Sequence, residues 1–294
     1  MTKANSSAGD LGITARVVFG DNLAVLKNLA AETVNLIYID PPFNTGKVQS
    51  RTQLRTNQSE DGDRVGFKGQ RYSSEILGKK SFEDEFDDYL TFLEPRLREA
   101  YRVLAKDGSL YFHVDYREVH YCKILLDSIF GRESFLNEII WAYDYGGRSK
   151  KRWPAKHDNI LVYVKDPKNY TFNVDEVERI PYMAPGLVGK EKAARGKLPT
   201  DTWWHTIVSP TGKEKTGYPT QKPLGVLRRI ISASSNPDDL VLDFFAGSGT
   251  TGVAASEAGR RFLLVDSNPE AIEVMKSRFK GQDVEFVSEA VKQE

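Results

Sequence analysis

Short apolar runs alternate with segments of helical periodicity along most of the chain. Val34–Ile39 is rich in apolar and β-branched residues and is too short for a helix. Such a run is typical of a strand covered on both faces, as in a parallel sheet. A helical pattern from Asp84 to Leu104 leads into another apolar run, Ser109–Val114. Strands that alternate with helices predict an α/β fold with a doubly wound sheet. Further strands are expected at Ala15–Phe19, Leu240–Phe244 and Phe262–Val265.

Two long stretches interrupt this alternation. Residues 44–81 show almost no periodicity, and loops of this length are usually functional or disordered, so we expect a mobile loop there. Asp166–Gly217 is also irregular and contains five prolines, which predicts a small insertion. An antiparallel pair is expected at Ile139–Tyr143 and Ile160–Lys165. The expected organisation is a flexible tail over 1–14, one half of the domain over 15–165, the insertion over 166–217 and the second half over 218–294.

Composition excludes several classes of protein and site. The 294 residues include 41 Lys plus Arg and 41 Asp plus Glu, which argues against a simple polycation that coats nucleic acid. Cys122 is the single cysteine, so disulfide frameworks and thiolate-rich metal sites are excluded, and four scattered histidines predict no metal site. No apolar run suits a membrane span, and the first fourteen residues lack the apolar core of a secretory signal. We expect a soluble, cytoplasmic protein without a membrane partner.

The tetrapeptide Asp40-Pro41-Pro42-Phe43 directly follows the run that ends at Ile39. Ligands of open α/β sheets bind at the carboxyl ends of strands, so chemistry is expected here. The Asp40 carboxylate and the Pro41 carbonyl accept hydrogen bonds, and neither proline carries a competing N–H donor. Two acceptors beside the flat ring of Phe43 suit a planar heterocycle that bears an amino group. The alternative is a rigid turn with a buried Phe.

A glycine-rich turn follows the run at Leu240–Phe244. Gly247, Gly249 and Gly252 match the G-x-G-x-x-G pattern of dinucleotide-binding proteins, and Asp266 lies nineteen residues after Gly247, where it would bind ribose hydroxyls. A nicotinamide-dependent oxidoreductase is one interpretation. Asp243 favours the other, S-adenosylmethionine, because a cationic sulfonium is attracted by carboxylates that would repel a pyrophosphate. The pattern alone leaves both open.

Taken together, DPPF at Asp40–Phe43, FAGSGT at Phe245–Thr250 and TQKP at Thr220–Pro223 resemble the DNA amino-methyltransferases. The tetrapeptide precedes the glycine loop, which is the circularly permuted order of the β group that includes type II and type III modification enzymes. The resemblance implies a Rossmann-like S-adenosylmethionine-dependent methyltransferase fold with a target-recognition insertion. It implies methyl transfer to the N6 amino group of adenine in duplex DNA, by base flipping and direct in-line transfer. N4-cytosine methylation is the alternative product.

The resemblance also implies roles for individual residues. Asp40 and Pro41, supported by Pro42, would hold the target amino group, and Phe43 would stack on the flipped base. Asp21 would face the adenosine, although a helix N-cap explains it equally well. Thr220 and Lys222 would lie near the cofactor carboxylate, although Lys222 can also be read as a solvated lysine. The residues expected to bind the cofactor are Asp21, Asp243, Phe245, Ala246, Gly247, Gly249, Thr250, Asp266, Thr220 and Lys222.

Local charge indicates where DNA would bind. Between Gly146 and Lys156 the chain carries several cations and no acid, with Trp153 among them, which suits contact with phosphates. Trp203 and Trp204 are expected in the core of the insertion, and His113 is expected to be packed inside the fold. The resemblance leaves open a homodimer and an accompanying restriction endonuclease. The residues expected to contact DNA are Arg148, Lys150, Lys151, Arg152 and Lys156.

Overall fold

The computed structural model describes residues 13–42, 49–58, 64–65, 71–82, 89–209 and 212–289. The chain divides into two compact units, Met1–Pro41 with Leu90–Glu294, and Pro42–Tyr89. In the described part of the larger unit, nine strands form one sheet in the order β12-β1-β11-β10-β2-β6-β8-β7-β9. The strands are β1 (Ala15–Phe19), β2 (Val34–Ile39), β6 (Leu104–Asp115), β7 (Phe135–Ala142), β8 (His157–Val164), β9 (Thr202–Trp204), β10 (Leu240–Asp243), β11 (Arg261–Asp266) and β12 (Glu285–Ser288).

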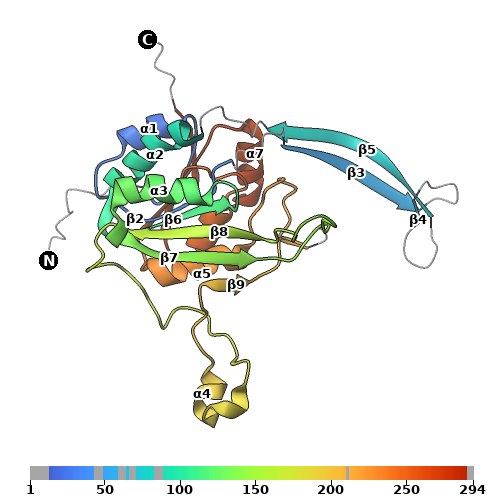
Figure 1. Cartoon of the computed structure of the whole chain (residues 1–294). Helices are drawn as coiled ribbons and strands as arrows, with labels where there is room; N and C mark the ends of the chain where they lie inside the picture. The colour runs from blue at the N-terminus through green and yellow to red at the C-terminus, as the bar shows by residue number, and fades with distance from the viewer. Residues whose placement is uncertain are drawn as a thin grey trace. The chain divides into compact units, whose positions relative to one another are not determined.

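Helices cover both faces of this sheet, as the alternating pattern predicts (Figure 1). Apolar residues of α5, α6 and α7 pack with Leu36, Val241 and Leu264 on one face. Strand residues of the opposite parity, such as Ile37 and Ile39, are buried as well, so β2 is covered on both sides. The helices are α1 (Asn22–Asn28), α2 (Tyr89–Val103), α3 (Val119–Phe130), α4 (Lys190–Arg195), α5 (Leu224–Ser234), α6 (Thr250–Glu257) and α7 (Pro269–Arg278), with single 3-10 turns at Arg132–Ser134 and Pro185–Leu187.

The carboxyl ends of neighbouring parallel strands meet at one edge of the sheet. β11, β10, β2 and β6 are parallel, β8 runs antiparallel to β6, and β7 runs antiparallel to β8. The expected antiparallel pair is therefore confirmed as β7 and β8. The carboxyl ends of the parallel strands lie at the same edge as the start of β8 and the end of β7. The loop between β7 and β8 leaves the sheet at this edge.

The expected insertion is partly built into the main sheet. β9 pairs in parallel with β7, with Trp203 opposite Trp141. Trp203 belongs to the main hydrophobic core, whereas Trp204 is 77% exposed, so the expectation that both pack in a core of the insertion is wrong. Side chains alternate across a strand, so neighbouring residues of β9 face opposite sides. That part of residues 166–217 recognises the DNA target stays a prediction.

The smaller unit corrects the expectation of an irregular loop. β3 (Gln49–Gln58) and β5 (Arg71–Phe82) pair along their length as antiparallel strands, and β4 (Arg64–Val65) joins β5. β3 has the sequence QSRTQLRTNQ, in which Leu54 is the single large apolar residue. An apolar–polar alternation arises when one face of a strand is buried, so this sequence contains no alternation to read. Mobility over residues 44–81 stays a prediction.

Packing makes Gly249 indispensable to the turn before α6. Its φ is +73°, and a Cβ built there would lie 2.7 Å from Met275 Cγ in α7. Gly259 has a similar φ of +69°, and no atom lies within 4 Å of the Cβ built there. A side chain would therefore strain the backbone equally at the two positions, but only position 249 lacks space for a Cβ atom.

We expect Gly249→Ala to lower the free energy of unfolding by roughly 1–3 kcal/mol more than Gly259→Ala. Both variants strain the left-handed backbone, and only the first forces a methyl group against Met275. Urea unfolding of the two variants measures the difference. Equal losses would show that the helix α7 side chains yield without cost, contrary to this packing argument.

Candidate active site

An aspartate stands at the carboxyl end of each of four adjacent parallel strands. Asp266 ends β11, Asp243 ends β10, Asp40 follows β2, and Asp115 ends β6. The sheet order places these strands side by side, so the carboxylates line one edge. The sequence pattern predicted the first three as site residues, and the structure brings those three to the same edge.

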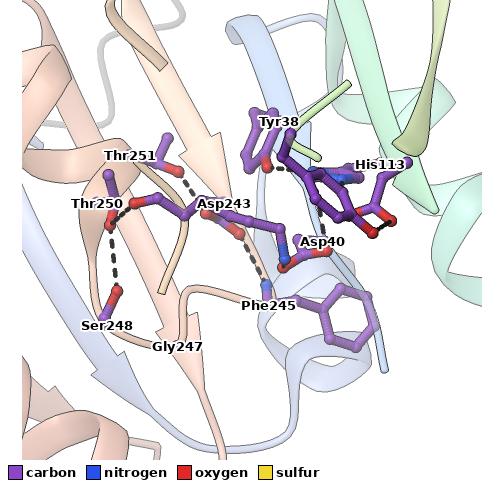
Figure 2. Close-up of polar contacts among 12 residues, drawn as sticks. Tyr38, Asp40, His113, Asp243, Phe245, Gly247, Ser248, Thr250 and Thr251 are labelled. Atoms are coloured by element: carbon purple, nitrogen blue, oxygen red, sulfur yellow. Dashed lines mark hydrogen bonds and ion pairs between the residues drawn. The ribbon is translucent and has the colours of Figure 1, made fainter. Parts of the chain in front are cut away.

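Asp40 is held between a lysine and a buried histidine. Its Oδ2 accepts a hydrogen bond from Lys222 Nζ, and its Oδ1 lies 3.9 Å from His113 Nδ1 (Figure 2). The Asp40 side chain is 14% exposed, and Oδ1 has no hydrogen-bond partner among the described residues. One carboxylate oxygen is thus paired, while the other is a buried acceptor whose capacity is unused within the protein.

A buried polar network lies beside Asp40. Tyr38 Oη and His113 Nδ1 are hydrogen-bonded at 2.7 Å, and His113 Nε2 lies 3.3 Å from Asp158 Oδ2. The Tyr143 hydroxyl donates to Asp158 Oδ1 at 3.3 Å. His113 is therefore packed inside the fold, as expected, and both ring nitrogens have partners. The network fixes the ring whose edge faces the Asp40 carboxylate.

Burial and charge set the protonation of this network. Burial raises the pKa of Tyr38 well above its ordinary value, and the negative charges of Asp40, Asp243 and Asp158 add to the effect. Tyr38 is therefore a neutral hydroxyl that can donate a hydrogen bond. Burial alone would raise the pKa of Asp158, but the hydrogen bond from His113 and the charges of His113 and Lys222 outweigh burial and lower that pKa. Asp158 is accordingly ionised.

Asp243 stabilises the glycine loop through two hydrogen bonds. Its Oδ1 accepts a hydrogen bond from Phe245 N at 3.0 Å, and its Oδ2 accepts one from Thr251 Oγ1 at 2.6 Å (Figure 2). Burial, with a smaller contribution from the charges of Asp40 and Asp266, outweighs the two hydrogen bonds and raises the pKa of Asp243 to about 7. Asp243 is thus an internal support, with both oxygens used inside the protein.

Asp266 holds the other side of the glycine loop. Its Oδ2 accepts from Gly247 N at 2.7 Å and its Oδ1 accepts from Asn268 N at 2.8 Å. Burial raises the pKa of Asp266, and these backbone hydrogen bonds act in the opposite direction. A Cβ at Gly247 would lie 3.1 Å from the Tyr218 ring, so this face of the loop is closed by Tyr218 as well. The loop conformation is fixed at both ends by carboxylates.

The remaining residues expected to bind the cofactor differ in their burial and contacts. Thr250 is buried at the start of α6, where its Oγ1 donates to the Lys222 carbonyl oxygen at 3.2 Å. Phe245 packs against Phe244 and Phe92, and Ala246 is buried. Thr220 is exposed in a turn. The main-chain carbonyl of Lys222 therefore contacts Thr250 next to the glycine loop, and its side chain contacts Asp40.

Asp21 has the helix N-cap role that was the alternative interpretation. Its Oδ1 accepts from Ala24 N at 3.0 Å, and its Oδ2 lies 3.2 Å from Arg96 Nη2. Contact with adenosine stays a prediction for this residue. In the tetrapeptide, Pro41 is buried and belongs to the larger unit, Pro42 begins the smaller unit, and Phe43 lies outside the described residues.

The basic residues expected to contact DNA lie on the loop between β7 and β8. Arg148, Lys150, Lys151 and Arg152 are exposed there. Lys156 is different, because its Nζ donates to the carbonyl oxygens of Tyr145 at 2.5 Å and Gly147 at 2.7 Å. Arg148 pairs with Asp144 and Arg152 donates to Tyr116 Oη at 3.4 Å, but both side chains stay exposed, whereas Lys156 is half-buried and stabilises the loop itself.

Sequence reasoning missed the residues that surround Asp40. Tyr38 and Asp158 were not singled out, and Lys222 was assigned to the cofactor and not to Asp40. Asp158, at the start of β8, is the partner of His113. In the part of the chain that the structure describes, no group of three His, Cys, Asp or Glu residues suits a metal ion. Nor does any helix among these residues have the length and apolar character needed to cross a membrane.

Comparisons with known proteins agree on one family. Residues 34–277 match the family described as DNA methylase. The DNA adenine methyltransferase YhdJ of Escherichia coli (strain K12) is 34% identical over 271 residues, which cover 88% of this chain and 80% of that protein. The type II methyltransferase M.HpaI of Haemophilus parainfluenzae is 31% identical over 267 residues, covering 91% and 74%. The crystal structure of the M1.HpyAVI–SAM complex superposes with a TM-score of 0.58 at 22% identity, covering 90% of this chain and 98% of that one.

The raised pKa of Asp243 predicts a change of stability with pH. Its pKa of about 7 in the folded protein exceeds the ordinary value of 3.8, so the stability linked to this group is fully present below about pH 4 and is lost as the pH rises through 7. Asn retains one acceptor and one donor of similar shape and does not ionise. We expect Asp243→Asn to reduce the loss of stability between pH 5 and pH 8 by about 1–3 kcal/mol.

Urea unfolding of both proteins at the two pH values measures this difference. Asp166 is a suitable control because its side chain caps an exposed turn, so Asp166→Asn should leave the pH dependence as it is in the parent protein. The same pH dependence in Asp243→Asn and the parent would contradict a buried carboxyl group with a raised pKa.

Proposed function

The chain belongs to the DNA methylase family, and we propose that it transfers a methyl group from S-adenosylmethionine to the N6 amino group of adenine in duplex DNA. The observation that carries the proposal is Asp40, a largely buried carboxylate at the end of β2 whose Oδ2 accepts an N–H donor, adjacent to the glycine loop that follows β10. The adenine product is favoured by a tetrapeptide that begins with Asp and by relatives that include a DNA adenine methyltransferase. Membership of a methylase family speaks against the nicotinamide-dependent alternative.

The charge of the site suits S-adenosylmethionine. Asp40 and Asp266 lie close enough to Asp243 for their charges to raise its pKa, so negative charge gathers at this edge of the sheet. A cationic ligand relieves this repulsion, whereas a pyrophosphate would increase it. When bound, S-adenosylmethionine supplies an electrophilic methyl group on a positively charged sulfur. The glycine loop, fixed by Asp243 and Asp266, is the part of the chain that would hold it.

Two acceptors at the end of β2 prepare the adenine amino group. Its nitrogen is a weak nucleophile because the lone pair is delocalised into the ring. Hydrogen bonds from its two N–H groups to the Asp40 carboxylate and the Pro41 carbonyl favour a pyramidal nitrogen with a localised lone pair. As the nitrogen acquires positive charge, the fixed carboxylate stabilises it, and this contribution requires no reorganisation at the moment of reaction. Asp40 is also positioned to accept the proton that the nitrogen then releases.

Lys222 has a defined place in this mechanism. Its ammonium group donates to Asp40 Oδ2, which supports the proposal that this oxygen accepts an N–H donor. The target amino group offers the same kind of donor, so it replaces Lys222 at that oxygen when the base enters. An ammonium group left there would oppose the positive charge that develops on the nitrogen. Binding of the base therefore requires the Lys222 side chain to turn away from Asp40.

The mechanism needs no covalent bond between enzyme and base. Cys122 is the single cysteine of the chain, and it is buried on α3. Burial raises the pKa of its thiol to about 12, and the charges of Glu118 and Asp115 contribute. A neutral, buried thiol is a poor nucleophile. This speaks against cytosine carbon-5 methylation, which depends on a thiolate.

DNA is the substrate of this family, and its proposed contacts lie on the β7–β8 loop. The exposed cations Arg148, Lys150, Lys151 and Arg152 would bind phosphates near the flipped adenine. The irregular part of residues 166–217 is proposed to recognise the target sequence. Type II relatives favour an accompanying restriction endonuclease, and a homodimer is a further proposal. A DNA substrate also favours a cytoplasmic location.

We expect Asp40→Ala to reduce methyl transfer by at least about a hundredfold, because it removes the carboxylate that binds and stabilises the amino nitrogen. Affinity for S-adenosylmethionine should stay within a few-fold of the parent, since the glycine loop is untouched. Tritium transfer from labelled S-adenosylmethionine to duplex DNA, followed by nucleoside analysis, measures the rate and identifies the product. Near-parental turnover in the variant, or a product other than N6-methyladenine, would overturn the proposal.

We expect replacement of Lys150, Lys151 and Arg152 by Ala to weaken DNA binding and to flatten its dependence on salt. Each residue that touches a phosphate contributes about one unit to the slope of log affinity against log salt concentration. Fluorescence anisotropy with a labelled duplex at several salt concentrations gives the slope. Affinity for S-adenosylmethionine is the control and should be unchanged. An unaltered slope would remove this loop from the DNA interface.

A further inference from the structure

Trp153 is almost entirely exposed. Its relative exposure is 95%, whereas Trp141 and Trp203 are buried in the core. A tryptophan side chain usually contributes a large buried area to a fold or an interface. A fully exposed indole therefore indicates a surface that binds another molecule. This indole lies on the β7–β8 loop, among the cations already assigned to DNA.

Hydrogen bonds hold the chain on both sides of Trp153. Lys156 Nζ closes the loop on the carbonyl oxygens of Tyr145 and Gly147. The Arg152 guanidinium donates to Tyr116 Oη at 3.4 Å, which ties the neighbour of Trp153 to the chain just beyond β6. Trp153 precedes Pro154, and a residue before proline is restricted to extended backbone. The exposure of the indole is therefore a property of a braced loop.

The loop arises beside the catalytic edge. β8 begins at His157, and Asp158 pairs with Asp115 at the end of β6. Asp158 is also the partner of His113, whose Nδ1 lies 3.9 Å from Asp40 Oδ1. Three residues separate Trp153 from His157. The indole is consequently carried by a short segment that starts next to the residues around Asp40.

We propose that Trp153 inserts into the DNA base stack and fills the space that the flipped adenine leaves. This inference rests on the proposed function, since only an enzyme that extrudes a base creates such a space. Apolar side chains that insert between base steps are a general means of stabilising unstacked DNA. The indole has the flat apolar face that stacking requires, and the cations around it bind the flanking phosphates.

A second exposed tryptophan provides a matched comparison. Trp204 is 77% exposed and belongs to β9, where it pairs with Ala142 at the same edge of the sheet. It is a strand residue within the hydrogen-bonded sheet, and it has Trp203 and His205 as neighbours in place of cations. The geometry thus favours Trp153 as the inserting residue, and Trp204→Ala tests whether loss of any exposed indole has the same effect.

The test compares two duplexes that differ only opposite the target adenine. In one the adenine is paired with thymine, and in the other it faces an abasic site, where extrusion breaks no base pair. We expect Trp153→Ala to slow single-turnover methylation of the paired duplex about tenfold or more, which is the value of one aromatic stacking contact. On the abasic duplex its rate should return to within a few-fold of the parent. Trp153→Phe should recover most of the rate on the paired duplex.

Further measurements separate the possible failures. 2-Aminopurine at the target position should brighten less with Trp153→Ala than with the parent, and the thermal unfolding midpoint should not change, because the removed side chain is exposed. Trp204→Ala should retain the parental ratio of rates on the two duplexes. Parental rates for Trp153→Ala, equal losses on both duplexes, or the same pattern in Trp204→Ala would overturn the insertion. A parent protein that methylates neither duplex would instead refute the proposed function.

Discussion

Crowding of carboxylates at one edge of the sheet is the constraint around which the rest of this site is built. Four parallel strands deliver aspartates to neighbouring positions, and burial removes the water that would otherwise screen them. Each carboxylate is then stabilised in its own way. Asp243 and Asp266 accept hydrogen bonds from the glycine loop, and Asp40 accepts one from Lys222. The repulsion that these contacts leave is what makes a cationic ligand favourable here.

The backbone of this arrangement was predictable because it depends on local pattern. β1 and β2 begin and end at the residues that the short apolar runs indicated, because each run is bounded on both sides by polar or turn-forming residues. The boundaries of β7 and β8 differ by several residues, because their outer ends approach the sheet edge and are less apolar. The antiparallel pair β3 and β5 could not be predicted, because its sequence lacks the alternation of apolar and polar residues that indicates a strand.

The candidate site was predictable only where residues follow a strand closely. Asp40, Asp243 and Asp266 were identified because each ends a recognisable apolar run. The pairing of Lys222 with Asp40 joins residues 182 positions apart, and the bond between Tyr38 and His113 joins residues 75 positions apart. Such pairs depend on strand order, which no local pattern encodes. The same holds for Asp158, whose partner His113 is on the neighbouring strand of an antiparallel pair.

The closure of the β7–β8 loop by Lys156 has a consequence for exchange of parts between related proteins. Because that lysine bonds to carbonyl oxygens inside the loop, the segment from Asp144 to Lys156 carries its own fastening. The residues of the network beside Asp40 lie outside this segment, with Tyr143 directly before it and Asp158 two residues after it. A graft with junctions at Tyr143 and His157 therefore replaces the whole loop and leaves Asp40 and the residues around it in place. The segment proposed to meet the duplex and the residues proposed to perform the chemistry are therefore separate stretches of the chain.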